Sequence, residues 1–262
     1  MTKIGLFDSG VGGLTVLKEL IESLPDKSYV YFGDTARFPY GGKSSDTIIR
    51  YAIENSTFLL DQGVELIAVA CHTATSLALN TLQNTFTIPV LGVIEPAVKK
   101  MIATTKNNHL GVIGTRATIA SGMYQNELLK HLPNATVTAC ACPLFVSLIE
   151  EQITSQKILR LVIKETLAPL KDKNIDTLLL GCTHYPLLAE LIQEEMGPDV
   201  QLVNPAKEFS EQLTVLHVKQ NHQIACKPSC SFFVSDDPIR FKAIGEAFLG
   251  IPMGSVERVS FS

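Results

Sequence analysis

Two short stretches of the sequence combine a thiol with imidazole and hydroxyl side chains. Residues 68–76 read AVACHTATS and residues 176–184 read DTLLLGCTH, so Cys71 and Cys182 each follow an apolar run. A thiol has an ordinary pKa of about 8.5 and can serve as an acid or a base near neutral pH. Two thiols on opposite sides of a carbon atom could remove a proton from one face and deliver one to the other. This arrangement favours the chemistry of a racemase or an epimerase.

Such a reaction also needs groups that pass protons to the thiols and adjust their pKa values. Asp8, at the end of the first predicted strand, is the candidate beside Cys71. His184, two residues beyond the second thiol, is the candidate on the other side, with a nearby carboxylate from Glu150 or Glu151.

The cysteines also allow other interpretations. Free cysteine is among the most buried residue types, although burial alone does not require matched positions. Cys71–His72 and Cys182–x–His184 together offer two thiols and two imidazoles, which zinc accepts, but their spacing differs from typical zinc motifs. The remaining cysteines could form a second site of four sulfur ligands, although they read more simply as the end of a strand and the flanks of a turn: Cys140, Cys142, Cys226 and Cys230. We therefore expect no metal.

Short β-rich runs alternate with helical patterns along the chain. The predicted strands at 3–7, 29–32 and 65–70 precede predicted helices at about 13–24, at about 45–62 and from near Ala74. This alternation is typical of βαβ units and a mostly parallel sheet. In such sheets ligands gather at the carboxyl ends of the strands, where both thiols lie.

The second half of the sequence repeats the order of the first. Residues 109–115, 176–184 and 201–206 resemble 3–9, 65–73 and 91–97, at offsets of roughly 106 to 111 residues. We predict two similar doubly wound α/β domains, related by pseudo-symmetry, with the active site in the cleft between them. The predicted domains are residues 1–96 with 208–262, and residues 97–207. A strand at 231–235 and a helix near 238–248 would return to the first domain.

The composition limits the function classes. With 46% hydrophobic and 18% charged residues in 262, the chain can form a sizeable core. The net charge of −4 and the absence of a Lys/Arg cluster argue against nucleic acid as a partner. The sequence contains no apolar stretch of membrane-spanning length, and Asp8 interrupts the region where a secretory signal would be apolar. We expect a cytoplasmic protein without a membrane partner.

The glycine-rich stretch DSGVGG at 8–13 does not indicate a nucleotide site. Thr15 stands where the dinucleotide motif requires glycine, and the lysine of a phosphate loop is absent. No lysine is placed as the two cysteines are, so the sequence offers no sign of a pyridoxal enzyme. We expect no cofactor.

Six motifs, in order and spacing, resemble the cofactor-independent glutamate racemases of the aspartate/glutamate racemase family. The motifs are distributed over most of the chain and read IGLFDSGVGGLTV (4–16), GDTARFPYG (33–41), VACHTAT (69–75), GVIGTRAT (111–118), ACPLFVSLIEE (141–151) and LGCTHYP (180–186). The resemblance implies that one cysteine removes the α-proton of L-glutamate while the other protonates the opposite face. The D-glutamate produced would supply peptidoglycan synthesis and cell wall biogenesis. Dimers are common in that family, so the resemblance is compatible with a homodimer, although the sequence itself does not set the oligomeric state.

The resemblance also implies the roles of individual residues. The acid–base residues would be Cys71, Cys182, Asp8, His184 and Glu150, with Glu150 preferred to Glu151 from its place in the motif. The substrate, glutamate, would contact Asp8, Ser9, Pro39, Tyr40, Gly41, His72, Thr73, Thr183 and His184. Hydroxyls and backbone N–H groups at strand-to-helix turns suit carboxylates and a developing carbanion.

Two positions depart from the family pattern. His72 stands where asparagine is usual, and Ser147 stands where proline is usual. His72 could replace the carboxamide as a neutral hydrogen-bonding group, or it could slow the reaction or shift the substrate to aspartate or diaminopimelate. A protein of another class, which binds an amino acid or zinc in the same cleft without turnover, is the remaining alternative.

Overall fold

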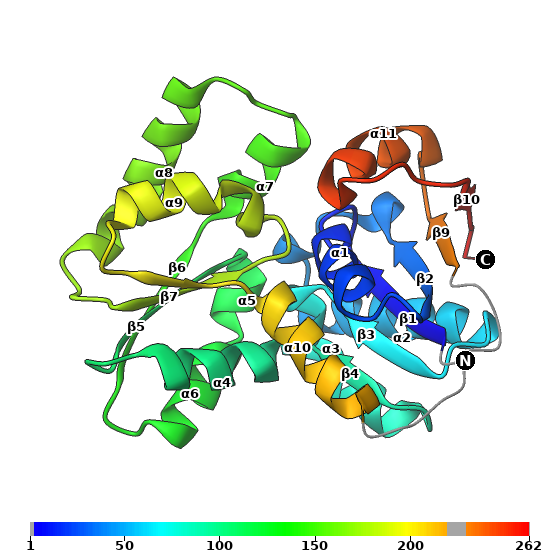
Figure 1. The fold of residues 1–262 in the computed structure, drawn as a ribbon, viewed down its shortest axis with the longest axis horizontal. Helices are drawn as coiled ribbons and strands as arrows, with labels where there is room; N and C mark the ends of the chain where they lie inside the picture. The colour runs from blue at the N-terminus through cyan, green and yellow to red at the C-terminus, as the bar shows by residue number, and fades with distance from the viewer. Residues whose placement is uncertain (1–2, 219–228, 262) are drawn as a thin grey trace.

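The computed structural model describes residues 3–218 and 229–261, and each of its two lobes is built on a parallel β-sheet (Figure 1). The first lobe contains a six-stranded sheet in the order β10-β9-β2-β1-β3-β4. Its strands are β1 (Lys3–Asp8), β2 (Ser28–Gly33), β3 (Leu66–Val69), β4 (Val90–Gly92), β9 (Cys230–Val234) and β10 (Val256–Arg258). The central strands are apolar and buried on both faces, as parallel strands between two layers of helices must be.

The second lobe contains a four-stranded parallel sheet in the order β6-β5-β7-β8. Its strands are β5 (His109–Gly114), β6 (Thr136–Ala141), β7 (Thr177–Gly181) and β8 (Gln201–Val203). The order matches β2-β1-β3-β4 of the first sheet, strand for strand. The predicted fold class of two similar, mostly parallel α/β units is therefore confirmed.

Helices cover both faces of the first sheet. Ile4 and Leu6 of β1 pack on one side, whereas Phe7 packs on the other, so the alternation of side chains divides the core into two layers. The helices of this lobe are α1 (Leu14–Ser23), α2 (Ser45–Asp61), α3 (His72–Thr85), α10 (Pro205–Val218) and α11 (Pro238–Leu249), with short 3-10 helices η1 (Thr35–Arg37) and η2 (Tyr40–Gly42).

The second sheet is covered in the same way. Leu110 and Val112 of β5 face a core that includes α4 and α6, and Ile113 faces one that includes α8. The helices are α4 (Ile94–Thr104), α5 (Arg116–Ala120), α6 (Met123–His131), α7 (Pro143–Glu150), α8 (Gln156–Lys171) and α9 (Ala189–Met196), with the 3-10 helix η3 (Tyr185–Leu188).

The last segment of the chain lies in the first lobe, because β9 pairs with β2 and Tyr31 of β2 lies opposite Phe232. The domain bounds 96/97 and 207/208 stay a prediction. The helix expected from near Ala74 begins earlier, at His72, since the Thr75 N–H donates to the Cys71 carbonyl at 2.8 Å and closes the first turn. Within the described residues, no helix is both long and apolar enough to cross a membrane.

The structure describes three of the four remaining cysteines. Cys140 lies one position before the end of β6, and Cys142 precedes α7. Cys230 begins β9, whereas Cys226, and with it the predicted turn, lies outside the described residues.

Candidate active site

A cavity of about 310 Å³ lies between the lobes at the carboxyl ends of the strands. Cys71 follows β3 in the first lobe and Cys182 follows β7 in the second, and both line this cavity. The two thiols occupy corresponding strand ends because the two sheets share one strand order. The predicted residues that also line the cavity are Ser9, Pro39, Tyr40, Gly41, His72, Thr73, Thr183 and His184.

Cys71 is held at the N-terminus of α3. Its Sγ atom lies 3.9 Å from the Ser9 Oγ atom, a weak hydrogen bond to a neighbouring strand end. Burial, and after it the charge of Asp8, raises the pKa of the Cys71 thiol well above its ordinary value. Cys71 is therefore a protonated thiol near neutral pH.

Asp8 lies behind the cavity rather than on its wall. Its Oδ2 atom accepts hydrogen bonds from the backbone N–H groups of Gly10 and Gly13, at 3.3 and 3.0 Å. Its Oδ1 atom is fully buried and has no hydrogen-bond partner among the described residues. Burial raises the pKa of Asp8, although His184 and the loop N–H groups oppose this effect. Its interaction with Cys71 is electrostatic, and its predicted role as the proton partner of that thiol stays a prediction.

Cys182, His184 and Glu150 form a chain of contacts on the other side. The Nδ1 atom of His184 lies 3.8 Å from the Cys182 Sγ atom, and its Nε2 atom lies 2.8 Å from the Glu150 carboxylate. Burial by itself would lower the pKa of His184, but the hydrogen bonds to Cys182 and Glu150 outweigh burial and raise it to about 10. An imidazolium therefore lies between the thiol and the carboxylate.

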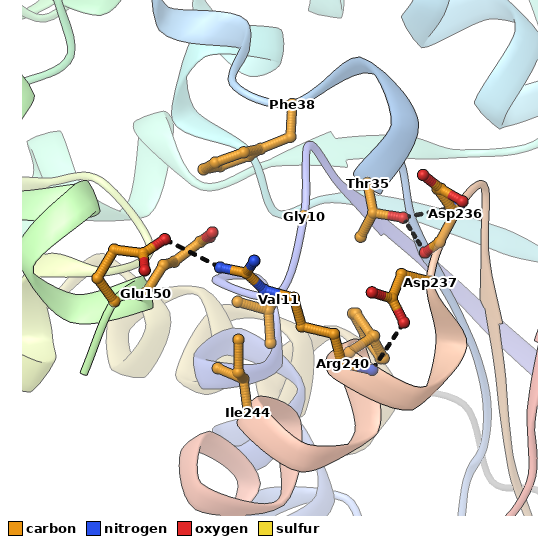
Figure 2. Close-up of a pocket in the computed structure, with 11 residues that line it drawn as sticks. Gly10, Val11, Thr35, Phe38, Glu150, Asp236, Asp237, Arg240 and Ile244 are labelled. Carbon is orange, nitrogen blue, oxygen red and sulfur yellow. Dashed lines mark hydrogen bonds and ion pairs between the residues drawn. The ribbon is translucent and has the colours of Figure 1, made fainter.

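The two adjacent glutamates have different partners. Glu150 ends α7 and contacts His184, whereas the Glu151 carboxylate accepts from the Arg240 guanidinium of α11 at 3.0 Å. Figure 2 shows Arg240 reaching from α11 across a neighbouring pocket toward α7, with Phe38 on the opposite wall. Of the two carboxylates, only Glu150 adjoins the thiol–imidazole pair.

A buried network fixes the loop that contains Pro39, Tyr40 and Gly41. Asp34 is fully buried and accepts hydrogen bonds from the Tyr40 hydroxyl, the Arg37 Nε–H at 2.7 Å and the Ser235 hydroxyl at 2.9 Å. The Tyr40 hydroxyl also accepts a bond from the Asn55 side chain at 3.0 Å. The Tyr40 hydroxyl therefore both donates and accepts a hydrogen bond within this network, which holds the loop in place, and Tyr40 forms part of the cavity wall.

The sequence reasoning missed a threonine of the second lobe. The Thr115 hydroxyl lies 2.9 Å from the Thr73 hydroxyl and 3.0 Å from the Thr118 hydroxyl, so this cluster joins the lobes at the cavity. The internal repeat contained a signal for it, because Thr115 follows β5 as Ser9 follows β1. Arg116 and Ser147 also line the cavity.

His72 has a partner that the sequence did not indicate. Its Nδ1 atom lies 2.6 Å from the hydroxyl oxygen of Tyr124, a buried residue of α6. Burial lowers the pKa of His72 to about 3, so its imidazole is neutral at ordinary pH. Within the part of the chain that the structure describes, no group of three or more His, Cys, Asp or Glu side chains is arranged to hold a metal ion.

The fold and this site define a class of enzyme with two α/β lobes and a pair of thiols at one cleft. Residues 9–213 match the model of the Asp/Glu/Hydantoin racemase family. The chain therefore belongs to the Asp/Glu/hydantoin racemase family.

Individual glutamate racemases are similar to this chain over nearly its whole length. The glutamate racemase of Geobacter metallireducens is 45% identical over 98% of this chain and 96% of its own length. A solved glutamate racemase isoform of Bacillus anthracis has a TM-score of 0.95 at 37% identity, covering 99% of this chain and 98% of that one. A glutamate racemase of Francisella tularensis, solved with D-glutamate, has a TM-score of 0.92 at 42% identity, covering 99% and 97%. An aspartate racemase of Picrophilus torridus shares only the fold, with a TM-score of 0.57 at 18% identity.

Proposed function

We propose that the protein is a glutamate racemase, an isomerase that interconverts L- and D-glutamate without a cofactor. The observation that carries the proposal is the pair of thiols at matching strand ends, Cys71 and Cys182, on one cavity between the lobes. The relatives of 37% identity or more named above are glutamate racemases, and the cavity volume of about 310 Å³ suits a small amino acid.

The geometry supports a mechanism with two bases. Cys182, as a thiolate beside the His184 imidazolium, takes the α-proton from one face of glutamate and leaves a carbanion. The Cys71 thiol then donates its proton to the opposite face, so the product has the inverted configuration. Cys71 is left as a thiolate and Cys182 as a thiol, the state that catalyses the reverse reaction directly. Exchange with solvent restores the first state.

The surrounding groups assist the two thiols. The His184 imidazolium, paired with Glu150, stabilises negative charge at Cys182 and can return a proton to it. Asp8 is the carboxylate on the Cys71 side. The hydroxyls of Ser9, Thr73 and Thr183 provide donors for the substrate carboxylates and for the charge that develops on the carbanion.

The cellular role is part of the same proposal. D-glutamate would supply peptidoglycan synthesis, and with it cell wall biogenesis and cell shape, from the cytoplasm. A homodimer is compatible with this proposal. These points rest on the family resemblance.

The test is proton NMR of the protein with L-glutamate in deuterium oxide, combined with chiral analysis. We expect the α-proton signal to disappear and D-glutamate to form. In Cys71→Ser and in Cys182→Ser we expect the rate of racemisation to fall about a hundredfold or more. An unchanged α-proton would reject glutamate as a substrate, and a protein that binds it without exchange would be a binding protein.

His72 favours one second candidate, the same chemistry on another amino acid. An imidazole in place of the usual carboxamide changes the cavity wall. Aspartate and diaminopimelate should be measured beside glutamate under the same conditions. A kcat/KM for either that exceeds the value for glutamate would support this candidate.

A further inference from the structure

His72 and Tyr124 form a buried pair that joins the two lobes beside the cavity. His72 begins α3 in the first lobe, and Tyr124 lies in α6 of the second. Their ring centroids are 6.1 Å apart, and the Nδ1 atom of His72 lies 2.6 Å from the Tyr124 hydroxyl oxygen. His72 is 3% exposed and Tyr124 is fully buried, so this hydrogen bond is shielded from water.

Both partners are uncharged near neutral pH. Burial lowers the pKa of His72 to about 3, and burial followed by the charge of Cys182 raises the pKa of Tyr124 well above its ordinary value. A neutral imidazole has one N–H group and one bare nitrogen, so the hydrogen bond must follow one of two patterns. Either the phenol donates to Nδ1, or the Nδ1–H group donates to the phenol.

The environment of Tyr124 selects between these patterns. Among the described residues, the Tyr124 hydroxyl has no hydrogen-bond partner other than His72. A buried O–H group without an acceptor is costly, whereas an oxygen lone pair without a donor is tolerated. The phenol therefore donates to Nδ1, and the imidazole hydrogen is on Nε2.

The Nε2 atom is then available to the cavity. In the described part of the chain, the fully buried side-chain N and O atoms without a partner belong to Asp8, Ser56 and Gln125. The Nε2 atom of His72 is not one of them and forms no hydrogen bond to a described residue, so it retains accessible surface. His72 lines the cavity, and because Nδ1 contacts Tyr124, Nε2 is the ring nitrogen left for a ligand there.

We propose that Tyr124 is a positioning residue that holds His72 as the Nε2–H tautomer, so that residue 72 presents a hydrogen-bond donor to a substrate carboxylate. The identification of the bound group as a substrate carboxylate rests on the proposed function, whereas the assignment of the His72 tautomer does not. A group that can only donate hydrogen bonds binds a carboxylate, which accepts them, but does not bind an ammonium group, which is itself a donor. The pair thereby favours a carboxylate over the ammonium group at the position beside Cys71.

The tautomer can be measured without substrate. Nitrogen-15 NMR of histidine-labelled protein at neutral pH distinguishes the protonated from the bare ring nitrogen, and His72→Asn identifies the His72 signals by their absence. We expect Nε2–H in the wild-type protein and a mixture of tautomers in Tyr124→Phe. A hydrogen on Nδ1 in the wild-type protein, or no change in Tyr124→Phe, would overturn the proposal. This result stands even if glutamate proves not to be the substrate.

Kinetics test the substrate contact. Tyr124→Phe should raise KM for glutamate about three- to tenfold, the effect of one neutral hydrogen bond, with a smaller change in kcat. In a His72→Asn background, Tyr124→Phe should leave KM within about twofold, because Tyr124 acts through the imidazole. An equal effect in both backgrounds would indicate a merely structural role and contradict the proposal.

Tyr29→Phe is the matched control. Tyr29 is also buried, but its hydroxyl donates within the first lobe, toward the carbonyls of Leu20 and Leu24 at 2.8 Å. We expect this variant to lose stability without changing KM or the His72 signals. A KM increase in Tyr29→Phe equal to that in Tyr124→Phe would overturn the specific role of Tyr124.

Discussion

At the scale of single residues, the proposed chemistry depends on the charge of His184. Burial opposes that charge, and the contacts with Cys182 and Glu150 restore it, with a pKa of about 10. Glu150→Gln removes the negative partner, so the pKa of His184 should fall. We expect kcat to decrease about ten- to a hundredfold, because a hydrogen bond to a charged group contributes about 1.5–3 kcal/mol. The alkaline limb of the pH profile should move to lower pH, since His184 loses its proton sooner.

The measurement is the pH dependence of kcat in both directions of the reaction. Glu151→Gln is the control, because Glu151 contacts the exposed Arg240 and not His184. An alkaline limb that stays in place in Glu150→Gln, or moves equally in both variants, would show that Glu150 does not maintain the charge of His184.

His72 predicts a second pH effect, on the free energy of unfolding. Burial lowers its pKa from 6.5 to about 3, so between these values the unfolded chain binds a proton that the folded chain does not. The stability contribution of neutral His72 is therefore present above pH 6.5 and is lost as the pH falls toward 3, by up to about 1.4 kcal/mol per pH unit. His72→Asn should lose stability less steeply over this range. Urea unfolding at several pH values measures the two slopes, and parallel slopes would contradict the prediction.

The sequence located the thiols because the duplicated motif places them at corresponding positions. It could not choose between Glu150 and Glu151 by structure, since successive helical residues point roughly 100° apart and only packing shows which one meets His184. The sequence could not predict Tyr124 as the partner of His72, because the two positions are 52 residues apart. Nothing in α6 itself indicates that partner.

At the scale of elements, the loop between β1 and α1 brings the two lobes into close contact. A Cβ atom on Gly12 would lie 2.5 Å from the His184 Nδ1 atom and would also collide with the Thr183 hydroxyl. Gly12→Ala should therefore displace His184 and lower kcat/KM about tenfold or more, because a misplaced acid–base group loses rate. The overpacking should also destabilise the fold by about 1–3 kcal/mol.

Activity and thermal denaturation of Gly12→Ala should be measured beside Gly254→Ala. A Cβ atom on Gly254 would meet nothing within 4 Å, so this control should behave as the wild type. Wild-type activity in Gly12→Ala would show that the loop can yield, and the close approach would then have no functional importance.

The alternation of strands and helices was predictable from local patterns, because each element carries its own periodicity. The loop at 34–42 was not, since Asp34 depends on Arg37 nearby and on Ser235, which is 201 residues away. The family motif named Pro39, Tyr40 and Gly41, but their support became visible only in the folded chain.

At the scale of the whole molecule, the two lobes explain why the thiols occur as a pair. One strand order, used twice, brings a strand-end cysteine from each lobe to one cavity. The exposed ion pair between Glu151, directly after α7, and Arg240 of α11 has side chains that are 66% and 56% exposed, and it contributes at most about 1 kcal/mol. The lobes are also joined by the buried hydrogen bond between His72 and Tyr124, which water does not screen in this way.

The most direct test of the two-thiol account is enantiomer-specific exchange in the single variants Cys71→Ala and Cys182→Ala. Each variant is incubated separately with L- and D-glutamate in deuterium oxide, and NMR follows the α-proton. We predict that each variant exchanges the α-proton of one enantiomer only, that the two variants prefer opposite enantiomers, and that neither forms the inverted product. Racemisation by either variant, or exchange of the same enantiomer by both, would contradict the account.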